Sequence, residues 1–225
     1  MNTAVELPTV ELPTVELPKA ELPNAELPNA AGALEPQQIW KGFHWLFFIN
    51  IQGLIICLRR LEASLTVGDV SAASAELETA TDLMLASGAS MELAGSFNRQ
   101  EYEHHIRPSM MPPQVKSTDF SGLMSWDHAS LMEIWKRLRP RFETLPTKLS
   151  AQHARFISAY LCMANAHSAV CQKFGGGEAG SLRCDKGTAV RTLEKFTHNR
   201  WKLIDPNRRV TGGCPFRAAG LNGES

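Results

Sequence analysis

The sequence contains no CxxC and no CxxCH motif, and its five cysteines are an odd number. CxxC spacing is typical of zinc ribbons and thioredoxin-type redox sites, and CxxCH of ordinary c-type haem attachment, so these classes are excluded. The N-terminus is acidic and proline-rich, which is the reverse of a secretory or transit peptide. An odd cysteine count without such a leader does not favour a disulfide framework. We therefore expect a reduced, cytoplasmic protein.

Long hydrophobic runs and alternating strand patterns are also lacking. The most apolar window, residues 43–58, is interrupted by His44, Asn50, Gln52 and Gly53. It is too short and too polar to span a membrane, so we expect a buried core helix and no membrane contact. No segment alternates apolar and polar residues in the way that a strand requires.

Net charge is zero, but it is unevenly distributed. Residues 1–35 hold six Glu and one Lys, whereas the remainder holds 22 basic and 17 acidic residues. This mild basic excess is too small to indicate a nucleic-acid partner, although it suits an anionic cofactor.

Residues 5–29 are five pentapeptide repeats: VELPT, VELPT, VELPK, AELPN and AELPN. Proline at every fifth residue forbids a helix, and each leucine lacks a second apolar face to bury. We expect residues 1–35 to form a disordered, extended arm. A docking tail and a neutral repeat expansion are both compatible with this pattern.

From Pro36 onward the apolar residues recur at steps of three and four, which predicts helices. We expect an all-α, compact helical bundle over residues 36–210, a loop over 108–122 and a flexible tail over 211–225. The expected helices cover residues 36–65, 70–88, 97–107, 126–139, 151–174 and 188–201.

His167 and Cys171 are four residues apart and share one face of an expected helix. A neutral imidazole is a good haem ligand, and a thiol one turn away is within reach of the porphyrin edge, where it could add across a vinyl group. The same HxxxC pattern also occurs where a hydrogen-bonded core histidine lies beside an inert core cysteine. By itself the HxxxC pattern is weak, so the iron-ligand role of His167 and the role of Cys171 both stay open at this point.

Two more histidines favour a shared pocket. His44 lies in the most apolar segment, where burial of an imidazole requires a partner or a function. His128 lies near the start of another expected helix, with 38 residues between it and His167. For His128 alone, a surface or capping role is the alternative.

A glycine loop directly follows the expected ligand helix, with Gly175, Gly176 and Gly177 at its start. Such a loop can bring backbone N–H groups against an anion, here a haem propionate or a substrate carboxylate. A helix C-cap with a flexible turn is the alternative. Arginine binds carboxylates bidentately, although most single arginines are solvated. The candidate substrate-binding residues are Arg107, Ser181 and Arg183.

Several segments together resemble the tryptophan 2,3-dioxygenases. The stretch from HWLFFI, which starts at His44, to LRRLE is similar to the helix that begins with their distal histidine. EYEHHIRPSM followed by FSGLMSWDH resembles their substrate-binding stretch and the segment after it. The run from His167 through KFGGGEAGSLR to AVRTLEKF is similar to their proximal histidine, glycine loop and next helix. Order and spacing hold over about residues 38–205, and the extra helices of the dioxygenases are missing.

Within this superfamily the sequence is most similar to the histidine-ligated haem aromatic oxygenases of the covalent-haem, 3-methyltyrosine-hydroxylating type, which carry a His…HxxxC motif. His128, His167 and Cys171 reproduce that motif. The resemblance implies that His167 is the proximal ligand, Cys171 a thioether link and His128 a second axial ligand. His44 would be an acid–base or substrate-orienting group over the haem, and the glycine loop would close on substrate.

One position departs from the pattern: Glu103 stands where the dioxygenases carry an arginine for the substrate carboxylate. Arg107 is the nearest replacement for it.

These observations predict an enzyme, a haem-dependent monooxygenase or peroxygenase that hydroxylates a small aromatic, tyrosine-like or phenolic substrate in natural-product biosynthesis. The oxidant would be O₂ with a reductant, or peroxide. One alternative is dioxygenase-like cleavage of an indole ring. Another is a non-enzymatic haem sensor or carrier, because two axial histidines leave the iron no open position. A helical interaction domain without cofactor is the last alternative, and homo-oligomerisation is left open.

Overall fold

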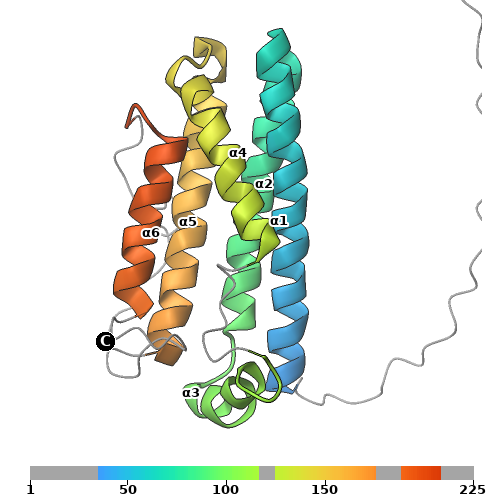
Figure 1. Cartoon of the computed structure of the whole chain (residues 1–225), viewed down its shortest axis with the longest axis vertical. Coiled ribbons are helices and arrows are strands. Elements are labelled where there is room, and N and C mark those ends of the chain that lie inside the picture. The colour runs from blue at the N-terminus through green and yellow to red at the C-terminus, as the bar shows by residue number, and fades with distance from the viewer. Residues whose placement is uncertain (1–34, 117–124, 176–188, 209–225) are drawn as a thin grey trace, which may run out of the picture. The chain divides into compact units, whose positions relative to one another are not determined.

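The computed structural model describes residues 35–116, 125–175 and 189–208. All regular elements in these ranges are helical, so the predicted all-α bundle is confirmed (Figure 1). The expected N-terminal arm and C-terminal tail lie outside the described residues. The α-helices are α1 (Pro36–Val67), α2 (Val70–Ala94), α3 (Arg99–Glu101), α4 (Trp126–Glu143), α5 (Ser150–Gly175) and α6 (Ala189–Ile204). A π-helical turn (Tyr102–Ile106) and two 3₁₀ turns (Arg107–Met110 and Thr147–Leu149) complete the described elements.

Some neighbouring helices in the bundle are consecutive in the sequence and others are not. Helix α1 packs along α2, α2 packs against α5, and α5 packs against α6. Helix α4 crosses the bundle and contacts both α1 and α6 (Figure 1). The candidate site residues lie in the first halves of α1 and α4 and in the second half of α5. These three helices and α6 belong to the same bundle.

Helix α1 begins and ends where its sequence predicts. Pro36 occupies the first turn, and Glu35 and Gln38 form a capping box. Gly68 ends the helix with φ +76°, a left-handed conformation that favours glycine. By length and apolar composition, α1 is the helix of the described residues that could cross a membrane. Leu54, Leu58 and Leu61 are fully buried in the bundle, and 33% of the most apolar window of α1 is buried. The expectation of a segment too short and too polar to span a membrane is therefore wrong by length and composition.

Several predicted boundaries were wrong. Helix α2 continues past Gly88 to Ala94, because Gly88 makes room for a neighbouring helix instead of ending its own. Helix α4 continues through Pro140 to Glu143. Pro108 lies inside a 3₁₀ turn and does not stop the helical segment before it. Trp126, the first residue of α4, is 88% exposed.

The buried side chains form two separate clusters. The larger one, the main core, fills the bundle between α1, α2, α4 and α5 and includes Leu58, Trp135 and Tyr160. The smaller one, the aromatic cluster, consists of Phe97, Tyr102, Ile106 and Phe174, with Ile39, Trp40, Met110 and Val170 packed against it. The rings of Tyr102 and Phe174 stack with centroids 4.5 Å apart. The candidate site borders this second cluster.

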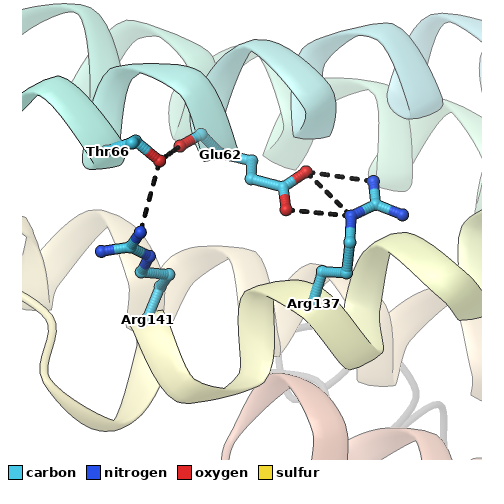
Figure 2. Close-up of polar contacts among 4 residues, drawn as sticks. All are labelled: Glu62, Thr66, Arg137 and Arg141. Atoms are coloured by element: carbon cyan, nitrogen blue, oxygen red, sulfur yellow. Dashed lines mark hydrogen bonds and ion pairs between the residues drawn. The ribbon is translucent and has the colours of Figure 1, made fainter.

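A polar contact on the outside of the bundle joins α1 to α4 (Figure 2). The Arg137 guanidinium donates to both carboxylate oxygens of Glu62, with Nε–Oε1 at 2.9 Å and Nη2–Oε2 at 3.0 Å. One turn away, Arg141 Nη2 donates to the Thr66 hydroxyl at 3.4 Å. Two-point arginine–carboxylate contacts fix orientation better than single ones, so this pair adds an oriented link between α4 and α1.

The cysteines differ from the expectation of a fully reduced chain. Cys162 is disulfide-bonded, whereas Cys57 and Cys171 are free. An odd cysteine count therefore did not preclude one pairing in this chain.

Candidate functional site

His44 lies in the third turn of α1, and Trp40 fixes its orientation. Its Nδ1 lies 3.0 Å from the Trp40 carbonyl oxygen, and the two rings are 4.0 Å apart between centroids. A carbonyl can only accept, so Nδ1 carries the hydrogen and Nε2 keeps its lone pair. Burial lowers the pKa of His44, and the bond to Trp40 partly opposes this. The imidazole is therefore neutral, with Nε2 available to a ligand.

His167 lies in the second half of α5. Burial, followed by the positive charges of Arg200 and of a protonated His44, lowers its pKa to about 4. Among the charges that lower this pKa are two from other helices, His44 on α1 and Arg200 on α6. His167 is therefore in the neutral form that binds metal.

His128 lies in the first turn of α4, where Ser125 caps the helix through the His128 N–H. Its Nε2 lies 3.2 Å from Nη2 of Arg200 on α6. Guanidinium only donates, so Nε2 of His128 accepts and this ring is neutral too. Burial and the Arg200 charge together lower the pKa of His128 to about 4.

Cys171 is partly buried on α5, one turn after His167. Burial raises the pKa of its thiol to about 11. Burial raises the pKa of Tyr102, and a charge on Cys171 is a lesser cause in the same direction. Val170, the residue before Cys171, packs against the aromatic cluster.

Arg200 is a residue of the site that the sequence did not reveal. It touches His128, it is hydrogen-bonded to the Tyr160 hydroxyl, and its guanidinium carbon lies 5.4 Å from the Phe196 ring centroid. Burial lowers the pKa of Arg200. The available signal was weak: Phe196 and Arg200 are four residues apart on the final helix, a common spacing.

The other predicted site residues have no contact with the three histidines among the interactions that the structure describes. Arg107 Nη1 lies 3.5 Å from Glu103 Oε1, so both residues at the predicted carboxylate position form one ion pair. Gly175 is the last residue of α5. Gly176, Gly177, Ser181 and Arg183 lie outside the described residues.

Two further features bear on ligand binding. Within the described residues, no group of three or more His, Cys, Asp or Glu side chains could hold a metal ion. A small hollow lined by Leu65, Val70, Arg141 and Pro146 lies at the far end of α1 from His44. It contains none of the predicted site residues.

The chain is similar to known peroxygenases. The family model for SfmD 3-methyl-L-tyrosine peroxygenase matches residues 3–152, a range that includes His44 and His128 and ends before His167. A 3-methyl-L-tyrosine peroxygenase from Streptomyces lavendulae is 32% identical over 179 residues, which are 78% of this chain and 49% of that protein. The chain thus spans about half the length of this relative. No solved structure matches the chain. The chain belongs to the SfmD 3-methyl-L-tyrosine peroxygenase family.

Proposed function

We propose that this protein is a haem-dependent peroxygenase that hydroxylates a small, tyrosine-like aromatic substrate. The observation that supports this most is that Arg200 contacts His128 and that its charge, like that of His44, lowers the pKa of His167. These interactions occur in a chain of a peroxygenase family. The name of the relative also favours peroxide as the oxidant and a tyrosine derivative as the substrate.

The donor set fits a haem. His128 and His167 are neutral near pH 7, since both pKa values are about 4, and neutral imidazole is the form that coordinates iron. Arg200 offers a cation to an anionic ligand, and the aromatic cluster offers apolar surface to a flat one. Bound haem would supply an iron that activates peroxide for insertion of one oxygen atom into an aromatic ring.

The residues of this chain then take distinct roles. His167 holds the iron from α5, and Cys171, one turn on, forms a thioether link to the porphyrin. His128 is a second iron ligand when its Nε2 is released from Arg200. His44, with Nδ1 bonded to the Trp40 carbonyl, presents Nε2 to accept or return a proton at the substrate.

The absorption spectrum of the purified protein tests the cofactor. Protein produced with haem supply should show a Soret band, and His167→Ala should lose or shift it. His105→Ala is the matched control, because His105 is exposed and on another element. A wild-type protein that takes up no haem would rule the proposal out.

The tether and the reaction need separate measurements. Denatured wild-type protein should keep a haem-sized mass adduct, Cys171→Ser should not, and the pyridine haemochrome should show one vinyl group saturated. Loaded protein with labelled peroxide should add one labelled oxygen to L-tyrosine or 3-methyl-L-tyrosine. Addition of two oxygens to L-tryptophan would indicate ring cleavage instead.

Two neutral histidines beside one cation also suit a haem held by both axial positions, as in a sensor or carrier. In that case no phenolic substrate changes the haem spectrum, and exogenous ligands such as cyanide do not replace His128.

A further inference from the structure

The side chain of Arg200 is a partly buried cation that has no acidic partner in the part of the chain that the structure describes. Among the described residues, no carboxylate forms an ion pair with it, and its contacts are a histidine, a tyrosine hydroxyl and a phenylalanine ring. Arginines that do form ion pairs with acids, such as Arg137 with Glu62, are more exposed than Arg200. Withdrawing a charge from water without a counter-charge is unfavourable, so such a group usually serves an anion that is not part of the chain.

The contact with His128 is chemically exclusive. The Nε2 lone pair that accepts from Arg200 Nη2 at 3.2 Å is the one that would bind iron. His128 cannot do both at once. A ligand that draws the guanidinium away therefore also frees the imidazole.

We propose, building on the proposed function, that Arg200 is a carboxylate-binding latch: it holds His128 Nε2 in the ligand-free protein and exchanges that bond for a ligand carboxylate. The planar guanidinium can bind a carboxylate through two parallel hydrogen bonds, which its single contact with an imidazole does not use. Tyr160 keeps the arginine at the site during the exchange, because its hydroxyl is anchored to the Thr197 carbonyl at 3.1 Å. Two carboxylates are chemically suited, a porphyrin propionate and the α-carboxylate of an amino-acid substrate.

Two pairs of probes distinguish these sources. The first pair is ferric protoporphyrin IX and its dimethyl ester, titrated by tryptophan fluorescence and absorption. The second pair is L-tyrosine and tyramine, titrated calorimetrically on both cofactor-free and haem-loaded protein. Each pair differs by the carboxylates alone. The proteins are wild type, Arg200→Gln and Arg200→Lys, with Arg155→Gln as control, since Arg155 is exposed on α5.

We expect wild type to prefer the acid member of one pair by roughly 10- to 100-fold, the range for a hydrogen-bonded charge pair. Arg200→Gln should abolish that preference, Arg200→Lys should retain part of it, and Arg155→Gln should retain all of it. A general loss of folding would weaken binding of both probes of a pair equally. The ratio of their two affinities therefore reports on the carboxylate alone.

A preference in the porphyrin pair identifies a propionate, and one in the tyrosine pair identifies the substrate. The inference is overturned if wild type prefers neither acid, or if Arg200→Gln keeps the wild-type preference. If neither porphyrin binds wild type, the haem proposal fails by itself, and the tyrosine pair on the cofactor-free protein still decides the role of Arg200.

Discussion

Gly88 on α2 and Met163 on α5 are in backbone contact across the bundle. A Cβ atom built on Gly88 would stand 3.2 Å from the Met163 Cα, closer than side-chain carbons normally approach backbone. Gly88 is itself buried in mid-helix. Glycine lowers helix stability, so its presence here is explained by the close approach of the two helices.

Replacement of Gly88 by alanine should therefore destabilise the fold. The methyl group would force α2 and α5 apart, and this should outweigh the gain of up to about 1 kcal/mol that alanine brings to a helix. Gly42→Ala is the matched control, because a Cβ there meets nothing within 4 Å. In urea unfolding, Gly42→Ala should equal or exceed wild type, and Gly88→Ala should fall below it. Equal gains in both variants would contradict the close contact.

The cofactor-free protein should lose stability as pH falls from 6.5 toward 4. The folded-state pKa values of His128 and His167 are about 4, below the ordinary 6.5, so the unfolded chain binds protons that the folded chain does not. No penalty exists above pH 6.5, and it is complete below pH 4. Each shift corresponds to at most about 3 kcal/mol, and water access reduces this to roughly 1–3 kcal/mol for the pair.

Urea unfolding at several pH values between 7.5 and 4.5 measures this slope. Carboxylates also protonate in acid, so the comparison is with His128→Gln and with the exposed His105→Gln. The first should flatten the slope between pH 6.5 and 5, and the second should not. The assignment is wrong if both variants follow wild type.

Cys171 should alkylate slowly at ordinary pH. The thiolate is the nucleophile, and with a pKa of about 11 only about a thousandth of the thiol is ionised at pH 8. Peptide mass spectrometry after iodoacetamide treatment should show labelling that rises about tenfold per pH unit toward that pKa. Cys171→Ser identifies the peptide. Rapid labelling at pH 7 would mean that the thiol is not buried as described.

Removal of the Glu62 charge should have a small, salt-dependent effect. Glu62→Gln breaks the two-point contact with Arg137, and partly exposed ion pairs contribute about 0.2–1 kcal/mol. The free energy of unfolding of wild type and of Glu62→Gln should be compared at low salt and at about 0.5 M added salt. Charges are screened beyond about 10 Å at 0.1 M and at shorter range above it, so the difference between the two proteins should shrink at high salt. Glu133→Gln, which loses the exposed contact with Lys136 inside α4, should have no measurable effect. A loss insensitive to salt would indicate a packing role for Glu62.

Much of the fold could be predicted because its signals are local. The steps of three and four between apolar residues, with Pro36 at the start and Gly68 at the end, predict α1. The errors arose where packing overrides local preference. A glycine such as Gly88 is typical of a helix end. Here the glycine is explained by the close approach of the Met163 backbone.

The candidate site was partly predictable for a similar reason. His44 and His167 stand out because an imidazole in an apolar helix requires an explanation. Arg200 does not stand out, because arginines on a polar helix are usually solvated. Its role depends on α4 and α6 lying close enough for it to reach His128, and helix contacts of that kind are not encoded in local sequence.

The division of buried side chains into two clusters has a consequence for how the proposed haem would enter. Cooperative units of a protein open independently when few contacts join them, each with its own opening free energy. The aromatic cluster holds Tyr102 and Phe174, and Trp40 and Val170 line it beside His44 and Cys171, whereas Leu58 and Trp135 belong to the main core. Amide exchange should therefore be faster around the aromatic cluster than around Leu58. The helices around the aromatic cluster could then open locally and admit the ligand after folding, while the helices around the main core stay packed.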